Sequence, residues 1–256
     1  GLPLGTKGHD LAETLTNTLN DLDINIVNEE VIDFNIENNI VQLKTNNNRY
    51  IAKSIIIATG ASFKKINVKG EAEFSGKGVS YCAVCDGFFF KGKKVAVVGG
   101  GNTAVEEALY LSEIADKVVL IHRRDELRAL DYLKNELFEK SNIEVMFNSN
   151  ISEIKGNDLL EELVVQNSLT GETQSVQLQG LFVAVGIEPN TKIVIVNKDE
   201  GGFIITDEQM RTNIKTVWAC GDCRKRPLKQ LITAASEGAI AAIGVYKYLK
   251  GHYISS

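Results

Sequence analysis

The sequence is poor in the residues that build metal sites and disulfide frameworks. It contains 4 cysteines and 3 histidines among 256 residues. They are Cys82, Cys85, Cys220 and Cys223, with His9, His122 and His252. The histidines are scattered without metal-ligand spacing, and no further cysteine pair lies near either CxxC. We therefore expect no metal site, and four cysteines are too few for the disulfide framework of a small secreted protein.

Long apolar runs and an excess of basic charge are also missing. No run approaches the ~18–20 apolar residues of a membrane span, and no signal peptide is visible. The formal net charge is −5, and the basic residues are dispersed apart from Arg123, Arg124 and Arg128. This pattern gives no indication of a nucleic-acid or membrane partner, and cytoplasm is the expected location.

The clearest local pattern is a strand, a glycine-rich turn and a helix. Lys93–Val98 is rich in β-branched residues, Gly99–Ala104 reads GGGNTA, and Asn102–Ala115 favours a helix. In a dinucleotide-binding loop, Gly99 would permit the tight turn, Gly101 the approach of a pyrophosphate, and Ala104 close packing of helix on strand. Asn102 and Thr103 complete the expected cofactor-binding loop. The alternative is a plain structural turn.

Basic residues follow the next predicted strand, Lys117–Ile121. An NAD-binding unit usually places Asp or Glu there, on the ribose hydroxyls. This chain instead has His122, Arg123 and Arg124, with Arg128 one turn later. Guanidinium groups suit a 2′-phosphate, which favours NADPH over NADH. The alternative is a solvated basic turn paired with Asp125 and Glu126.

Just upstream of the glycine loop lies Cys82-Ala83-Val84-Cys85-Asp86. Two cysteines at this spacing can close a small disulfide, and one thiol of such a pair commonly attacks as a thiolate. Asp86 could then shuttle a proton. A CxxC pair can also be half of a zinc site or a coincidence, but a dithiol beside a dinucleotide loop favours redox chemistry.

The stretch CAVCDGFFFKGKKVAVVGGGNTAVEEALYLSEIADKVVLIHRRDELRA closely resembles the low-molecular-weight, bacterial-type thioredoxin reductases. Further similar segments are Ala58–Gly60, Gly186–Asn190 and Gly221-Asp222, in the same order and spacing. In that family NADPH reduces FAD, the flavin reduces a disulfide, and the dithiol reduces thioredoxin. The resemblance thus implies FAD and NADPH as cofactors, thioredoxin as partner and a homodimer.

The resemblance also assigns roles to residues. It makes Cys82 and Cys85 the redox pair, with Cys85 nearer the flavin, and Asp86 the proton donor. The residues that it implies for FAD are Thr59, Gly60, Gly221, Asp222, Lys229, Gln230 and Leu231. Lys229 stands where many members have Arg, and it lacks the bidentate fork of a guanidinium.

One departure concerns the start of the chain. Members of the family open with a strand and a GxGxxG loop for the FAD pyrophosphate, whereas this sequence resembles the part that follows. By that comparison, roughly fifty residues of the FAD domain are expected to be missing, and with them the helix terminus that anchors the phosphates. The expectation is either a fragment or a derivative that binds FAD poorly.

The predicted fold is α/β, with two Rossmann-like nucleotide-binding domains of the three-layer ββα type. The NADPH domain (67–187) is inserted into the FAD domain (1–66 and 188–256), and the length agrees with a prior of ~100–200 residues per domain. Leu11, Leu15, Leu19 and Leu22 predict a helix that buries one face. Predicted strands lie around 24–27, 31–36 and 40–43, and the last helix is predicted over Leu228–Lys250.

Two other functions fit the same sequence. One is a reductase of another thiol protein, such as a peroxiredoxin or a glutaredoxin-like protein. The other is a flavin-free, truncated NADPH-binding module. Cys220 and Cys223 are expected to be incidental buried or half-buried thiols and not a second redox centre.

Overall fold

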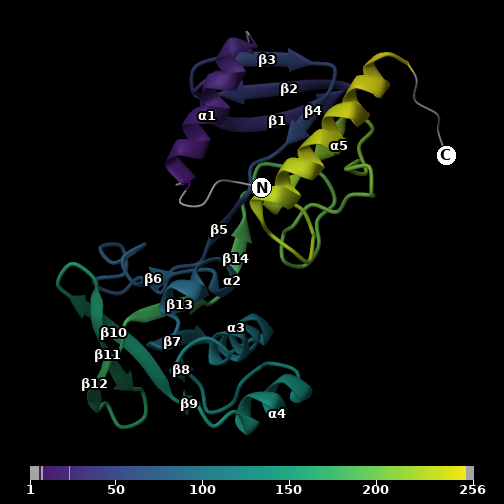
Figure 1. The fold of residues 1–256 in the computed structure, drawn as a ribbon. Coiled ribbons are helices and arrows are strands. Elements are labelled where there is room, and N and C mark those ends of the chain that lie inside the picture. The colour runs from purple at the N-terminus through teal and green to yellow at the C-terminus, as the bar shows by residue number, and fades with distance from the viewer. Residues whose placement is uncertain (1–5, 7, 23, 252–256) are drawn as a thin grey trace. The chain divides into compact units, whose positions relative to one another are not determined.

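The computed structural model describes residues 6, 8–22 and 24–251, which form two compact units (Figure 1). The insert unit consists of Thr59–Asn190, and the outer unit consists of the chain up to Ala58 and from Thr191 onward. The predicted domain boundaries, after residues 66 and 187, both fall inside the insert unit. The assignment of NADPH to residues 67–187 and of FAD to the remainder stays a prediction. No helix in the described part of the chain is long and apolar enough to cross a membrane.

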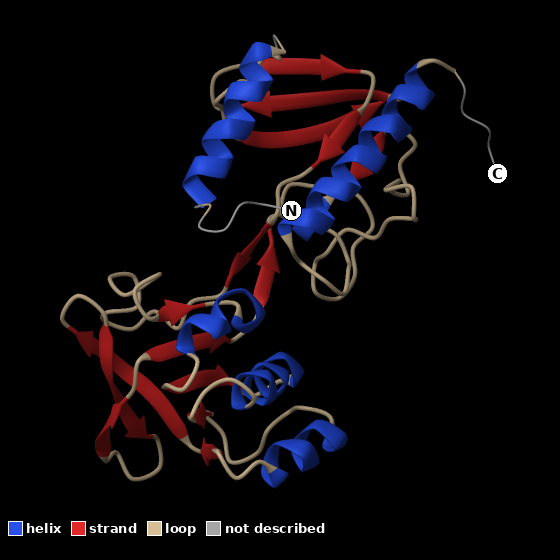
Figure 2. Ribbon diagram, in the orientation of Figure 1, coloured by secondary structure: helices blue, strands red, loops and turns tan. Residues whose placement is uncertain are grey.

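A five-stranded parallel sheet is the centre of the insert unit (Figure 2). Its order is β6 (Val79–Ser80), β13 (Gly180–Ala184), β7 (Lys94–Gly99), β8 (Lys117–Ile121) and β9 (Ile143–Met146). Val95, Val97, Val118 and Leu120 are fully buried. Continuous β-branched and aliphatic runs are typical of parallel strands that are covered on both faces.

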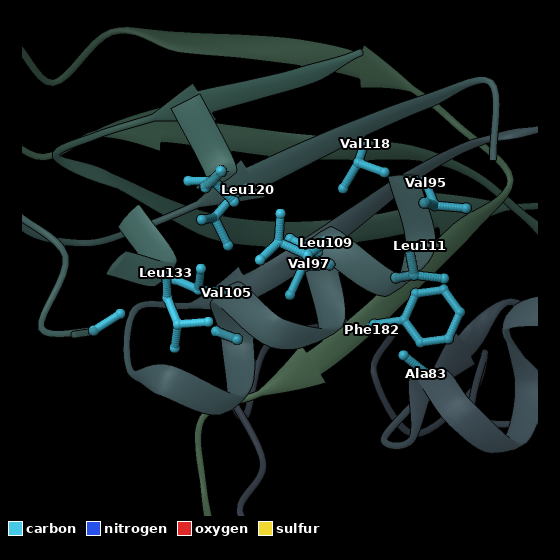
Figure 3. Packing of buried hydrophobic residues seen from close by; sticks show 14 of the residues in the cluster. Ala83, Val95, Val97, Val105, Leu109, Leu111, Val118, Leu120, Leu133 and Phe182 are labelled. Carbon is cyan, nitrogen blue, oxygen red and sulfur yellow. The ribbon is translucent and has the colours of Figure 1, made fainter. Parts of the chain in front are cut away.

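The two faces of this sheet carry different layers. Helices α3 (Asn102–Ser112) and α4 (Asp131–Glu139) cover one face, where Val105, Leu109 and Leu111 pack with the sheet residues in one core cluster (Figure 3). Strands β10 (Ser149–Gly156), β11 (Leu160–Asn167) and β12 (Thr173–Gln177) form an antiparallel sheet whose inner residues share a second core cluster with the parallel sheet. The insert unit therefore has the predicted three-layer ββα arrangement.

A short helical turn precedes β7 and packs against α3. It comprises α2 (Ala83–Asp86) and the 3₁₀ helix η1 (Gly87–Phe90). Ala83 is fully buried and lies beside Leu111 and Phe182 (Figure 3). A Cβ atom at Gly87 would lie 3.1 Å from both the Leu111 and Tyr110 side chains. The glycine thus lets the turn sit close to α3.

The chain enters and leaves the insert unit along two paired strands. These are β5 (Ala61–Phe63) and β14 (Ile187–Pro189), which pair antiparallel. Beyond the pair, the Asn190 N–H donates to the Gly60 carbonyl over 3.0 Å, and the Asn190 side-chain amide donates to the Thr59 carbonyl over 3.0 Å. The two ends of the inserted segment are therefore neighbours.

The outer unit contains a meander, a strand pair and two helices. Helix α1 (Gly8–Asp21) precedes β1 (Val31–Glu37), β2 (Ile40–Thr45) and β3 (Arg49–Ala52), which form an antiparallel sheet. Strand β4 (Ile55–Ile57) pairs parallel with β15 (Val217–Ala219), followed by the 3₁₀ helix η2 (Gly221–Cys223) and α5 (Leu231–Leu249). The strands predicted around 31–36 and 40–43 are confirmed as β1 and β2, which are joined by a tight turn with Asn38 and Asn39 at φ values of 51° and 62°.

Three predictions for the outer unit need correction. Residues 24–27 form no strand, and Ile24, Ile26 and Val27 are exposed, so the apolar alternation there has no pairing partner among the described residues. None of the described residues of α1 is buried, so its leucine stripe does not cover a core in this chain. The last helix starts at Leu231 and not at Leu228, because a capping box between Gln230 and Thr233 fixes its first turn.

Candidate active site: a disulfide and a basic nucleotide pocket

Cys82 and Cys85 form a disulfide at the start of α2. Cys82 is the N-cap residue, and its Sγ accepts a hydrogen bond from the Cys85 N–H over 3.2 Å. Cys85 is exposed and Cys82 is half-buried. Cys85 thus offers an exposed side of the disulfide, and the N–H contact to the Cys82 sulfur is of the kind that stabilises a thiolate, so the pair is suited to thiol–disulfide exchange.

Asp86 is held close to the disulfide by Ser80. The Ser80 hydroxyl donates to Asp86 Oδ2 over 2.6 Å and accepts from the Cys82 N–H over 3.2 Å. Ser80 ends strand β6 and is only 6% exposed, so the sheet fixes its position. A carboxyl that could transfer a proton is thus connected to the backbone of the redox turn. Ser80 has no motif signal in the sequence and was missed.

A second carboxyl, that of Glu107 on α3, contacts the same turn. Its Oε1 accepts from the Ala83 N–H over 3.4 Å, and its Oε2 is buried without a hydrogen-bond partner. Burial raises the pKa of Glu107 to about 7, and the Ala83 N–H acts in the opposite direction. Sequence reasoning missed this residue as well. The signal was present, because Glu107 lies three residues after Ala104 and four before Leu111, on the otherwise apolar, buried face of the helix.

Exposed apolar side chains follow the disulfide along the chain. Val84, Phe88 and Phe89 are 65%, 71% and 73% exposed. We call these three residues the Phe88 patch. Large exposed aromatic side chains that adjoin a reactive group are informative, because apolar surface of this kind commonly marks a protein-binding site.

A cavity of about 530 Å³ lies in the insert unit beside the glycine loop. Of the described residues that line it, none is acidic, and five are basic or can become cationic. These are Lys64, Lys65, His122, Arg123 and Arg128. Such a lining favours an anionic ligand. Lys64 and Lys65, which follow β5, were not predicted from the sequence. Of the predicted loop and turn residues, Ala104 and Arg124 do not line the cavity.

Each glycine of the loop has its own steric reason. A Cβ atom at Gly99 would lie 2.4 Å from the Ala184 carbonyl oxygen and 2.6 Å from the Ala104 Cβ, so the glycine and the alanine together allow close packing. A Cβ atom at Gly100 would lie 2.1 Å from the His122 ring. Gly101, the N-cap of α3, has open space around that position and no side-chain cap. The N-terminus of α3 is therefore accessible to a phosphate.

His122 connects the loop to the basic turn. Its Nδ1 lies 2.8 Å from the Gly99 carbonyl oxygen and its Nε2 lies 3.0 Å from the Glu126 carbonyl oxygen. The Arg128 N–H also donates to the Gly100 carbonyl over 2.7 Å. These bonds fix the arginines relative to the glycines. Both nitrogens of the ring are engaged with the backbone, so His122 serves the pocket mainly as a brace.

The arginines of the basic turn are not used in ion pairs. Within the described ranges, no acidic side chain pairs with Arg123, Arg124 or Arg128, and Glu126 instead pairs with Lys134 at 3.3 Å. The alternative of a turn neutralised by Asp125 and Glu126 therefore loses its support. The open helix terminus, the glycine cradle and the unpaired guanidinium groups fit NADPH, whose pyrophosphate and 2′-phosphate need these donors.

The residues predicted for FAD fall in both units. Gly221 (φ +75°), Asp222, Lys229, Gln230 and Leu231 belong to the outer unit, whereas Thr59 and Gly60 belong to the insert unit. Asp222 Oδ1 is buried without a hydrogen-bond partner, which fits a hydroxyl-bearing ligand such as the ribityl chain of FAD. The Lys229 ammonium lies 4.3 Å from the centroid of the Phe203 ring, and burial lowers its pKa.

Cys220 and Cys223 form no disulfide with each other and are buried, as predicted. The Cys223 thiol donates to the Cys220 carbonyl over 3.2 Å. Burial raises the pKa of Cys220. A buried thiol with a raised pKa is a poor nucleophile, so Cys220 has the properties of a structural cysteine.

A nucleotide pocket and a reactive disulfide in one α/β unit define a class of disulfide oxidoreductase, and the comparison with known proteins agrees. Residues 6–238 match the pyridine nucleotide-disulphide oxidoreductase family, and the chain belongs to that family. It is an oxidoreductase.

Among its members, the chain is similar to thioredoxin reductases. It is 41% identical over 254 residues to the thioredoxin reductase of Peptoclostridium acidaminophilum, covering 96% of this chain and 81% of that protein. It is 41% identical over 213 residues to the thioredoxin reductase of Bacillus subtilis, covering 81% and 67%. The crystal structure of the Streptococcus pyogenes thioredoxin reductase superimposes with a TM-score of 0.92 at 38% identity, covering 96% and 81%. Thioredoxin reductases use FAD and NADPH.

Proposed function

We propose that this chain carries out the NADPH-dependent reduction of the thioredoxin disulfide, with FAD as cofactor and Cys82/Cys85 as the exchanging pair. The observation that carries the proposal is the accessible Cys82–Cys85 disulfide in the same unit as a basic, glycine-cradled pocket. The similarity to thioredoxin reductases supports thioredoxin as the substrate. The same similarity supports a homodimer and a cytoplasmic location.

The cofactors would be held by two groups of residues. In the pocket, the backbone of Gly99–Ala104 would bind the pyrophosphate of NADPH, and Arg123, Arg124 and Arg128 would bind its 2′-phosphate. Asp222, with Lys229, Gln230 and Leu231 at the start of α5, would hold FAD, and the FAD-binding roles of Thr59 and Gly60 remain predictions. When bound, FAD carries two electrons from NADPH to the disulfide.

The reduced pair would then act by thiol–disulfide exchange. The thiolate of one cysteine attacks a sulfur of thioredoxin, and the second cysteine resolves the mixed disulfide. Asp86 would supply a proton to the departing thiolate, and the hydrogen bond from Ser80 keeps its carboxyl at the turn. The assignment of Cys85 to the flavin side remains a prediction. The Phe88 patch would contact the protein substrate, since it exposes apolar surface next to Cys85.

The test is the oxidation of NADPH by the purified, FAD-loaded protein in the presence of thioredoxin. We expect Cys82→Ser and Cys85→Ser to abolish turnover while bleaching of the flavin by NADPH is retained, and Cys220→Ser to have little effect. Wild-type turnover in either variant of the first pair would refute the assignment. Parallel assays with a peroxiredoxin and a glutaredoxin-like protein identify the preferred partner, and a protein that retains no flavin would support the binding-module alternative.

A further inference from the structure

Glu107 is a buried titratable group that contacts the redox turn and to which the scheme above gives no role. It lies on α3, and its Oε1 accepts from the N–H of Ala83, the residue bonded to Cys82. Covalent geometry therefore keeps this oxygen within about 8 Å of the Cys82 sulfur. Charges this close influence each other's protonation, particularly where water is excluded.

The surroundings of Glu107 disfavour a carboxylate. Ala104, Val105, Ala108 and Leu111, its neighbours on α3, are all 0% exposed. Oε2 has no hydrogen-bond partner, and a buried charged oxygen without one is costly. Burial raises the pKa of Glu107 to about 7, so the group can gain or lose a proton near neutral pH.

Other titratable groups are nearby, but they do not explain the raised pKa of Glu107. The redox turn carries Cys82, Cys85 and Asp86, and α3 itself carries Glu106 and Tyr110, with Glu113 as its C-cap. The elements packed on α3 carry charged groups that include Lys94, Lys117 and Lys134. None of them contributes to the pKa of Glu107, which is set by burial and the Ala83 N–H. The Asp86 carboxyl is already bonded to Ser80.

The reaction requires a place for a second proton. Reduction of the thioredoxin disulfide consumes two electrons and two protons. When NADPH supplies two electrons to Cys82–Cys85, the S–S bond breaks and one proton is taken up, which gives one thiol and one thiolate. This state holds both electrons but only one of the two protons. A thiolate beside Glu107 also disfavours a second negative charge there.

We propose that Glu107 is a positioning residue for the redox pair, and that its carboxyl takes up the second proton when the disulfide is reduced. The proton comes from solvent as the thiolate forms. Glu107 releases it when the electrons pass to the substrate, and together with the proton of the remaining thiol it supplies the balance of the two protons that the thioredoxin dithiol gains. By taking up this proton, Glu107 lets the neighbouring cysteine remain a thiolate, and it does so without contacting the substrate. This inference rests on the proposed role of Cys82 and Cys85.

The experiment measures the midpoint potential of the Cys82–Cys85 couple against pH. The 256-residue protein is equilibrated in dithiothreitol redox buffers from pH 6 to 8.5, trapped by alkylation and quantified by mass spectrometry. Glu107→Gln removes the titrating group and keeps the shape. The matched control is Glu106→Gln, which changes the exposed neighbour on the same helix. Glu107→Asp is a second variant that retains a carboxyl.

For the wild-type protein and Glu106→Gln, we expect reduction above pH 7 to take up two protons per two electrons. For Glu107→Gln we expect one proton per two electrons. Glu107→Asp should restore part of the uptake of the second proton. Equal proton numbers in the wild type and Glu107→Gln would overturn the inference. The measurement needs neither flavin nor thioredoxin. A protein in which Cys82 and Cys85 do not exchange with the buffer would instead contradict the proposed function.

Discussion

At the scale of single residues, the nucleotide pocket depends on one missing side chain. Gly100 faces the His122 ring so closely that any side chain would displace the ring. His122 in turn connects the Gly99 carbonyl to the turn that carries the arginines. One glycine therefore controls the relative position of the two phosphate-binding elements.

We expect Gly100→Ala to lower the affinity for NADPH at least about tenfold, which corresponds to ~1.4 kcal/mol. The added methyl group forces His122 and the arginine turn away from the glycine loop. Fluorescence titration with NADPH measures the effect. Gly8→Ala serves as control, because the space around its Cβ position is open, its φ is not positive and it does not line the pocket. Unchanged affinity in Gly100→Ala would contradict the bracing role of His122.

Glu107 also predicts a dependence of stability on pH. Its pKa is raised in the folded protein from 4.5 to about 7, so it stabilises the fold fully below pH 4.5 and this contribution is lost as the pH rises through 7. Glu107→Gln should therefore gain stability relative to the wild type between pH 5 and pH 8. Hydrogen exchange of the β7 amides, compared at each pH, measures the difference. A difference that does not change with pH would show that Glu107 titrates normally.

The functional residues that the sequence predicts and those that it does not predict differ in whether they belong to a sequence motif. Cys82, Asp86, Gly99 and the arginines belong to motifs with a fixed spacing. Ser80 and Glu107 act through contacts between β6, α2 and α3, and such contacts depend on how the elements pack. A charged residue on the buried face of α3 was the one clue available.

At the scale of elements, α3 supports both functional parts of the insert unit. Its N-terminus faces the pocket, and its middle packs under the redox turn, where Leu111 is fully buried beside Ala83 (Figure 3). The strand–loop–helix pattern around β7 and α3 was predictable, because propensity, glycine spacing and tertiary packing agree there. The leucine stripe of α1 and the apolar alternation at 24–27 have the expected periodicity, but no described element packs on them. Predictions from periodicity alone were therefore wrong at these two segments.

Leu111→Ala should destabilise the insert unit by about 2–5 kcal/mol, since it leaves a cavity between α3 and the redox turn. We expect the alkylation rate of the reduced cysteines to change as well, because Ala83 loses its support. The matched control is Leu169→Ala in the turn between β11 and β12, where the leucine is 76% exposed and should contribute less than about 0.5 kcal/mol. Urea unfolding followed by circular dichroism compares the two variants, and similar losses would contradict this account.

At the scale of the whole molecule, each unit has its own interior. The two core clusters of the insert unit contain residues from Ile66 to Ala184 only, and the two clusters of the outer unit contain none of these. A unit with a closed core can fold by itself.

We therefore expect residues 59–190, produced alone, to fold and to bind NADPH with an affinity within about threefold of the full chain. Circular dichroism and NADPH titration test this expectation. Arg128→Gln in the same fragment controls for specific binding and should weaken NADPH more than NADH. An unfolded fragment would show that the outer unit contributes to its stability.

The pairing of β5 with β14 has a consequence for protein engineering. Because the two ends of the inserted segment are adjacent, a gene encoding Thr59–Asn190 can be excised and the flanking residues Ala58 and Thr191 rejoined through a short loop. The same segment can be transplanted into a surface hairpin of another protein. It would then act as a portable cassette that carries a disulfide and a coenzyme pocket between two neighbouring attachment points.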